Sequence, residues 1–189
     1  MVAFVSPDRV VFREVGGEDP WLPGEVPGSV HTDLLNLDRI PDPFVADNEL
    51  QVQWVAERAW EYRVLFDVDP AMVEAERVFL VCEGLDTLAR VSFNDEILGE
   101  TDNMFRRCRW DVTGVLKAGE NEMHVTFAST VETMLEAQAD EPLIGPSQSI
   151  PGGAHVRKAP CQFGWDWGPQ LPPVGIWKPV RLEAHTTAR

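Results

Sequence analysis

Two nine-residue stretches of the chain alternate apolar and polar side chains so regularly that they limit the fold to one built on β-strands. In WEYRVLFDV (60–68), every second residue from Trp60 to Val68 is apolar, and three of the four residues between them are charged, namely Glu61, Arg63 and Asp67. GENEMHVTF (119–127) begins with a turn and then alternates in the same way. A period of two is that of a half-buried strand, because successive side chains of a strand point to opposite faces.

Proline and glycine divide the rest of the chain into short apolar runs, with 15 and 14 residues respectively. Such spacing is typical of an all-β protein. Further strands are predicted at 77–84 (covered on both faces), 88–100 (a hairpin that turns at Asn94-Asp95), 108–112 and 176–185. Pro179 lacks an N–H group, so it predicts an edge position or a bulge in the last of these strands.

Helical patterns are few. Ser29 is a good N-cap for one or two helical turns within 29–38, and residues 131–140 are good helix formers. We therefore predict a single domain over residues 1–189, an all-β sandwich or jelly roll with one or two short helices. Two loops rich in proline and glycine, 40–50 and 141–175, are long for a compact domain, and the second is expected to be ordered and functional.

The charge balance excludes several classes of partner. With 16 Lys and Arg against 31 Asp and Glu, the formal net charge is -15. Such a surface repels nucleic acid and anionic membranes, and no apolar run is long enough to span a bilayer. The amino-terminal residues do not form a secretory signal, so a cytoplasmic location is expected.

The cysteines and histidines do not form a recognisable metal site or catalytic motif. Cys82, Cys108 and Cys161 lack CxxC spacing and are expected to be buried free thiols. Ordinary core or surface roles are expected for the four histidines, His31, His124, His155 and His185. The sequence therefore predicts no metal and no cofactor.

The stretch GWDWGP (164–169) contains the most informative chemistry. Indole rings stack on the apolar faces of sugars, and a carboxylate accepts hydrogen bonds from neighbouring hydroxyls. Trp165, Asp166 and Trp167 on a stiff loop would suit a sugar subsite. The alternative is that both tryptophans cap the core and Asp166 accepts backbone hydrogen bonds, and spacing alone leaves both interpretations open.

Two other polar groups are candidates with ordinary explanations. Asn48, in the triplet Asp47-Asn48-Glu49, has the composition of a turn or a helix cap. Arg106, Arg107 and Arg109 are expected to form a solvated strand face paired with carboxylates.

An ordered series of segments resembles glycoside hydrolase family 2, and within it most resembles β-mannosidases. The series runs through VPGSVHTDLL (26–35), IPDPFVADNE (40–49), WEYRVLFDV (60–68), DNMFRR (102–107), AGENEMHVTF (118–127), RKAPCQFGWDWGP (157–169) and GIWKPVRLE (175–183). It covers nearly the whole chain, and GWDWGP followed by GIWKPVRL is its most specific part. The resemblance implies the amino-terminal, galactose-binding-like jelly-roll domain of the family, which an immunoglobulin-like domain and a (β/α)₈ barrel follow.

The same resemblance implies which domain carries the catalytic residues and which contributes to substrate binding. Family 2 enzymes are retaining glycosidases whose acid/base and nucleophile are both glutamates on the barrel, and no acid of this chain matches them. Residues 1–189 alone are therefore expected to be inactive.

In this family, a loop of the jelly-roll domain contributes residues to the active site of the barrel. The matching positions imply that Asp166 binds sugar hydroxyls in the −1 subsite and that Trp165 walls it. Asn48 is a further contact, and Trp167 and Arg157 are expected to support these residues from behind.

The expected function is thus a contribution to hydrolysis of terminal, non-reducing β-D-mannose residues, with β-mannoside sugars and the enzyme's own barrel as partners. Three alternatives stay open. The domain could belong to a family 2 β-galactosidase or β-glucuronidase, it could be a stand-alone carbohydrate-binding module, or it could be a purely structural domain.

Overall fold

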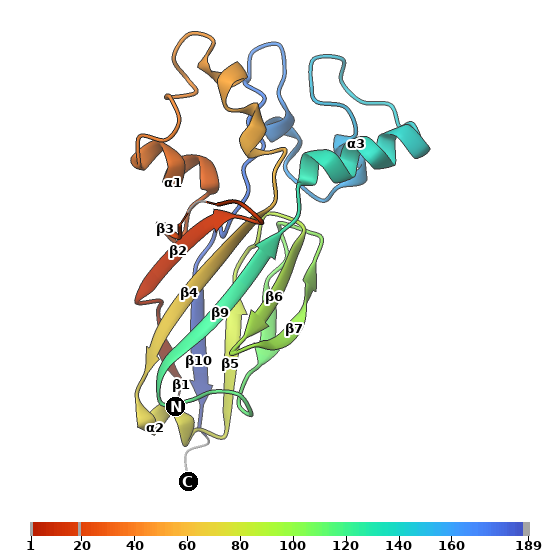
Figure 1. Ribbon diagram of the computed structural model, residues 1–189. Helices are drawn as coiled ribbons and strands as arrows, with labels where there is room; N and C mark the ends of the chain where they lie inside the picture. Colours follow the sequence, from red (N-terminus) through yellow and green to blue (C-terminus); the bar gives the residue numbers. More distant parts are fainter. Residues whose placement is uncertain (1, 19, 187–189) are drawn as a thin grey trace.

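The computed structural model describes residues 2–18 and 20–186, which form a sandwich of two antiparallel sheets (Figure 1). One sheet has the strand order β1-β10-β5-β8 and the other has the order β3-β2-β4-β9-β6-β7. The strands are β1 (Val2–Val5), β2 (Arg9–Glu14), β3 (Leu22–Pro23), β4 (Trp60–Val68), β5 (Arg77–Cys82), β6 (Ala89–Phe93), β7 (Glu96–Thr101), β8 (Cys108–Asp111), β9 (Gly119–Phe127) and β10 (Val180–His185). The predicted all-β sandwich is confirmed.

The two stretches with the clearest alternation are the central pair of the larger sheet. β4 and β9 pair along their whole length, from Trp60 opposite Phe127 to Val68 opposite Gly119. The predicted hairpin also forms, and its turn residues Asn94 and Asp95 have positive φ angles of 48° and 69°. Asn and Asp tolerate this left-handed backbone, which a two-residue hairpin turn requires. Strands β1, β2 and β3 were not predicted from the sequence.

The apolar faces of the two sheets meet in one continuous core. Tyr62, Phe66 and Phe127 from β4 and β9 are fully buried, and so are Leu80 on β5 and Phe93 on β6. Four of these side chains lie on the apolar faces that the alternation predicted, because inward residues recur at every second position.

Most helical segments and long loops lie at one end of the sandwich (Figure 1). The helices are α1 (Val30–Asn36), α2 (Pro70–Val73) and α3 (Thr130–Asp140), and short 3₁₀ helices span Asn48–Gln51, Gln53–Val55, Gly153–His155 and Pro160–Phe163. Only α2 lies at the opposite end. Ser29 caps α1 by accepting a hydrogen bond from the Thr32 N–H, as predicted. Within the described ranges, no helix has the length and apolar character needed to cross a membrane.

Two local predictions were wrong in part. The last strand begins at Val180 rather than at residue 176, because Pro179 has no N–H for the ladder, although its carbonyl accepts from the Glu83 N–H at 3.0 Å. All three cysteines are free, but Cys82 alone is fully buried, whereas Cys108 is half-buried and Cys161 is exposed. Cys161 lies in a 3₁₀ helix of the long loop, away from the sheets.

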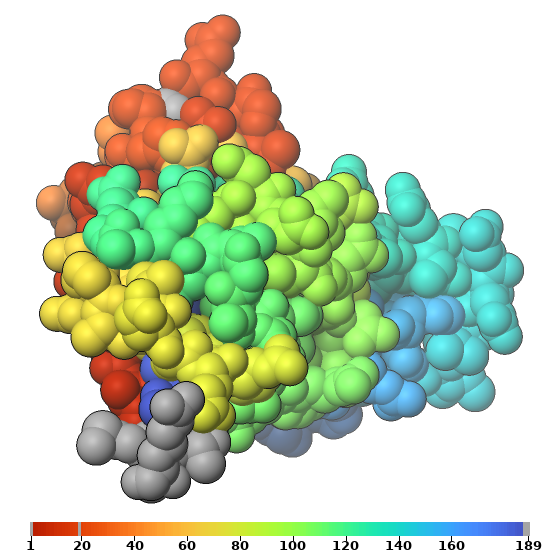
Figure 2. Space-filling view, turned by 90° about the horizontal axis from the view of Figure 1, so that it is seen from below, coloured from red at the N-terminus to blue at the C-terminus, as the bar shows by residue number. Residues whose placement is uncertain are grey.

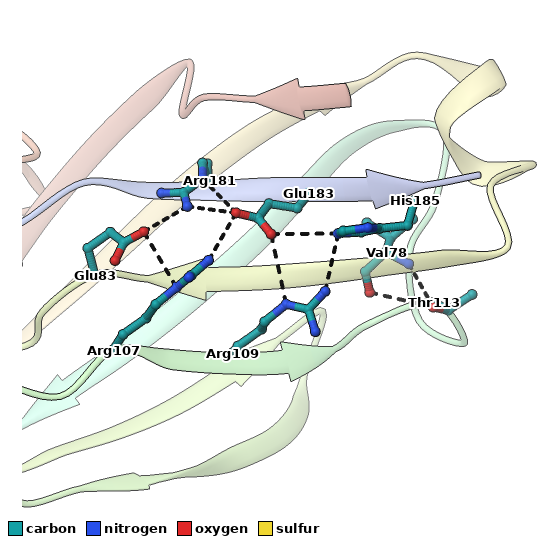
Figure 3. A network of polar contacts seen from close by, with 8 residues as sticks. All are labelled: Val78, Glu83, Arg107, Arg109, Thr113, Arg181, Glu183 and His185. Atoms are coloured by element: carbon teal, nitrogen blue, oxygen red, sulfur yellow. Dashed lines mark hydrogen bonds and ion pairs between the residues drawn. The ribbon is translucent and has the colours of Figure 1, made fainter. Parts of the chain in front are cut away.

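The outer face of the four-stranded sheet has a network of ion pairs (Figure 3). Glu183 on β10 accepts from Arg181 at 2.6 Å and from Arg107 at 3.2 Å, and Arg109 lies 3.8 Å from its second oxygen. Burial raises the pKa of Glu183, but the guanidinium groups more than offset this and hold it below its usual value. The predicted pairing of Arg107 and Arg109 with carboxylates is confirmed. The guanidinium group of Arg109 also lies over the ring of Phe79 on the outer face of β5. This contact agrees with the prediction that the strand at 77–84 is covered on both faces.

Asp33 of α1 is a buried acid at the loop-bearing end of the sandwich. Its carboxylate accepts from the Glu25 N–H at 3.0 Å and from the Tyr62 hydroxyl at 3.1 Å. Burial raises the pKa of Asp33 to about 6, since the desolvation cost of the charge exceeds the gain from the hydrogen bonds. The folded chain therefore binds a proton at Asp33 more tightly than the unfolded chain does.

This shift predicts a pH-dependent effect of the Asp33→Asn substitution. The stability that Asp33 contributes is full below about pH 4 and is lost as the pH rises through about 6, whereas asparagine does not titrate. Relative to the wild type, the variant should gain about 2 kcal/mol in its free energy of unfolding between pH 4 and pH 7. Urea denaturation at one-unit pH intervals measures this difference, and parallel curves for the two proteins would contradict it.

Candidate functional site

GWDWGP forms a tight turn whose two central residues are Asp166 and Trp167. The residues on either side exchange both backbone hydrogen bonds, from the Trp165 N–H to the Gly168 carbonyl at 3.0 Å and from the Gly168 N–H to the Trp165 carbonyl at 3.2 Å. The turn therefore presents three consecutive side chains, two indoles and one carboxylate, on a backbone that is fixed at both ends.

The glycine that opens the motif is required by its geometry. Gly164 has a φ of +96°, a conformation that residues with a side chain rarely adopt. A Cβ atom there would also lie 2.4 Å from the Cγ of Gln170 on the returning arm of the loop. Gly164 thus lets the two arms of the loop approach each other directly below the turn.

The turn is exposed to solvent. Trp165 is 41% exposed and Trp167 is 81% exposed, with their rings 5.4 Å apart and tilted by 50°. Among residues 2–18 and 20–186, no group forms a hydrogen bond or ion pair with the carboxylate of Asp166. The alternative in which both tryptophans cap the core is therefore wrong. Trp167, which was expected to support the others from behind, is the more exposed of the two indoles.

An open cavity of about 760 Å³ lies beside the turn. Its lining includes Trp165, Trp167, Phe163, Ile150, Ile144 and Leu143. Phe163 is buried in a small second core with Met134 of α3, whereas Ile144 is fully exposed at the rim. Seen from the α2 end, the segments around α3 and the long loop, coloured cyan and light blue, project beyond the sheets on one side (Figure 2). The surface beside the turn therefore contains several apolar side chains, of which Ile144, Trp165 and Trp167 are exposed.

The other two predicted site residues, Asn48 and Arg157, lie in segments outside the turn. Asn48 donates from Nδ2 to the Asp42 carbonyl at 2.9 Å and accepts from Gln51 at 3.0 Å, as expected of a turn residue. Gln53, from the adjacent 3₁₀ helix, donates to the Gln170 carbonyl at 2.8 Å and so joins this segment to the long loop. Arg157 has an exposed side chain, and its carbonyl accepts from the Met104 N–H at 3.0 Å.

The long loop is more regular than its composition indicated. Residues 141–175 contain two of the 3₁₀ helices, and neighbouring backbone groups brace the segment that carries the turn. The Ile150 N–H donates to the Phe163 carbonyl at 2.9 Å, and Gln170 donates to the Gln148 carbonyl at 3.1 Å.

A buried ion pair at the base of this loop was not predicted from the sequence. Lys158 Nζ lies 2.5 Å from Asp86 Oδ1, and the two side chains are 0% and 1% exposed. Composition gives no sign of it, because both residues are ordinarily found at the surface.

Comparison with known proteins identifies the fold. Residues 11–178 match the model of a family described as the glycosyl hydrolase 2 galactose-binding domain-like family. The chain belongs to this family. The galactose-binding-like sandwich that the resemblance implied is thereby confirmed.

Several relatives that resemble the chain along most of its length are named as β-mannosidases. The chain is 42% identical to the β-mannosidase of Capra hircus over 174 residues, which is 87% of this chain and 20% of that protein. It is 38% identical to the β-mannosidase B of Aspergillus terreus over 178 residues, or 92% of this chain and 21% of that protein. The crystal structure of the β-D-mannosidase of Dictyoglomus thermophilum aligns with a TM-score of 0.90 and 37% identity, covering 100% of this chain and 23% of that one. The chain therefore spans about a fifth of the length of these relatives.

Proposed function

We propose that residues 1–189 are the amino-terminal sugar-binding domain of a retaining β-mannosidase, which removes terminal non-reducing β-D-mannose residues. The relatives named above carry that activity in their names, and the chain corresponds to about a fifth of each. The two glutamates that such an enzyme needs would lie on a barrel domain outside this segment.

The observation that carries this proposal is the exposed turn with an unpartnered acid. Trp165, half-exposed, offers an indole face to a sugar ring, and Asp166 offers a carboxylate that no described group of the chain engages. A charged acceptor forms strong hydrogen bonds to a pair of sugar hydroxyls, and an exposed indole buries the apolar face of the same sugar. Together they form one wall of the −1 subsite.

The apolar surface beside the turn fits a role against the barrel. Ile144 is fully exposed, Phe44 is 77% exposed and Leu50 is 69% exposed, all in segments at the loop-bearing end of the sandwich. We assign these side chains, together with the apolar lining of the cavity beside the turn, to an interface with another domain that would cover them. In this arrangement the domain packs on its own barrel through this end and lends Trp165 and Asp166 to the active site.

The roles of the other candidate residues follow from their positions. Trp167, on the tip of the turn, contacts either the substrate or the barrel, since it makes one ring contact within the domain, with Trp165. Asn48 fixes its own segment by donating to the Asp42 carbonyl, and the side chain of Arg157 is exposed to solvent.

The specificity is tested on the longer protein with a panel of aryl glycosides. Hydrolysis of the β-mannoside in preference to the β-galactoside and β-glucuronide supports the proposal, and the opposite preference contradicts it. Calorimetry on residues 1–189 alone tests the stand-alone binding module. We expect a Kd for mannose weaker than about 1 mM, because half of a subsite buries too little of a sugar to offset its ordering cost.

A further inference from the structure

The turn is carried by a compact loop, residues 158–173, whose ends are held together by one side chain. Lys158 Nζ donates to the carbonyl of Pro173 at 2.6 Å, which closes the neck of the loop. Further along, the Leu171 N–H donates to the Gln162 carbonyl at 3.1 Å. The backbone bonds between Trp165 and Gly168 close the tip of the loop. Hydrogen bonds therefore join the two arms of the loop at its base, its middle and its tip, as in a packed Ω-loop.

The same ammonium group also anchors the neck to the sandwich. Its second partner is Asp86, in the connection between β5 and β6, at 2.5 Å. The backbone of Asp86 exchanges two hydrogen bonds with Gly175, just beyond the loop, at 2.9 Å and 3.1 Å. Lys158 therefore bonds the beginning of the loop to its end and to a fixed part of the sheet connection.

Lys158 and Asp86 each supply the opposite charge that the other needs in the buried interior. Thr87 donates its hydroxyl to the Asp86 oxygen that faces Lys158, but the other oxygen of Asp86 has no hydrogen-bond partner within the described ranges. Burial lowers the pKa of Lys158, and the Asp86 carboxylate opposes this. Burial and the charge of Lys158 lower the pKa of His31 to about 4, so His31 adds no second positive charge at neutral pH.

A buried pair of this kind specifies an arrangement more than it adds stability. Two well-packed apolar side chains would hold a core at least as firmly, but they lack the directional bonds that select one geometry. Lys158 donates hydrogen bonds to the Pro173 carbonyl and to the Asp86 carboxylate. These two bonds fix the point at which the loop leaves the sandwich.

From this geometry we propose that Lys158 is a positioning residue, which fixes the Trp165–Asp166 turn by closing the neck of loop 158–173. It acts through the hydrogen bonds that join the two arms of the loop and not by contact with a sugar. What the turn does rests on the proposed function, whereas the closure of the loop does not.

Hydrogen exchange on residues 1–189 tests the closure directly. In Lys158→Met, the amides of Trp165, Gly168 and Leu171 should exchange faster by on the order of a hundredfold, because removing one member of a buried pair destabilises the closed loop. Amides of β4 and β9 should keep wild-type rates. Lys117→Met, the same change at an exposed position, is the control and should alter neither set. Unchanged loop amides, or equal acceleration throughout the sheets, would overturn the proposal.

A milder variant keeps the test decisive if Lys158→Met does not fold. Asp86→Asn preserves the shape and an acceptor for Lys158 but removes the opposite charge. It should give the same pattern, confined to the loop amides, with a smaller acceleration. Protection of the loop amides equal to that of the wild type in this variant would count against the proposal.

A double-mutant cycle in the longer enzyme tests whether Lys158 acts through Asp166. Lys158→Met should lower kcat at least about tenfold in the wild-type background and less than about twofold in the Asp166→Ala background, since coupled residues are non-additive. Equal losses in both backgrounds would show an independent structural role and overturn the inference. If Asp166→Ala itself is silent, the proposed function fails, while the exchange experiment still decides the role of Lys158.

Discussion

Replacing Asp166 with alanine is expected to lower kcat/KM of the longer enzyme for aryl β-mannosides by about 10²–10³-fold. Hydrogen bonds to sugar hydroxyls that tighten in the transition state contribute several kcal/mol in retaining glycosidases, and a charged acceptor makes the stronger kind. The melting temperature should not change, because no described group of the domain bonds to the Asp166 carboxylate. Steady-state kinetics and thermal denaturation measure the two effects separately.

The control for this prediction is Asp140→Ala, which removes an exposed carboxylate at the end of α3. It should leave both turnover and stability near their wild-type values. Asp166→Asn keeps the shape of the side chain but loses its charge, so we expect a smaller loss than with alanine. Near-wild-type hydrolysis by Asp166→Ala would end the assignment of this residue to the sugar subsite and would favour a purely structural domain.

The sheet elements could be predicted because their signals are local. In β4 and β9, inward and outward side chains alternate along the strand itself, so a single stretch shows which face is buried. The Asn94-Asp95 turn and the Ser29 cap are likewise set by residues a few positions apart. β1 escaped prediction because VAFV has no alternation of apolar and polar residues and forms an edge strand, in which Phe4 is 61% exposed.

The site could be predicted only in part, because exposure is a tertiary property. The types and spacing of residues in GWDWGP indicated sugar chemistry, yet the same residues would suit a core cap. Whether Trp165 and Trp167 point to solvent depends on how residues 141–155 and 160–171 pack on α3. The Lys158–Asp86 pair could not be predicted at all, since its members are far apart in the sequence and each resembles a surface charge.

The position of the turn also explains why the sandwich must be rigid. A subsite residue displaced by about 1 Å can cost a large factor in rate, so the loop needs a support that does not deform. The loop is attached to the sandwich through the bond from Lys158 to Asp86 and through the backbone bonds between Asp86 and Gly175. The position of the loop therefore depends on the sheets keeping their shape. Under the proposed function, the stability of the core is therefore also needed for the turn to act.

Phe66→Ala is expected to lower the free energy of unfolding by about 3–5 kcal/mol, the usual cost of removing a buried phenylalanine ring. Phe66 is fully buried at the centre of β4, with its ring 6.3 Å from that of Phe93. The cavity cannot collapse easily, because rigid paired strands surround it. For a domain of this size the loss corresponds to a decrease in Tm of roughly 10 °C.

Phe4→Ala is the matched control, because it makes the same change on the edge strand β1, where the ring is 61% exposed. A ring that is largely in water in the folded state loses little when it is removed, so we expect a change below about 0.5 kcal/mol. Urea denaturation compares the two variants through the shift in midpoint at an unchanged m-value, since a changed m would indicate an altered unfolded state instead. Equal effects of the two variants, or a loss below about 1 kcal/mol for Phe66→Ala, would show that the inward face of β4 does not form the core on which the loop depends.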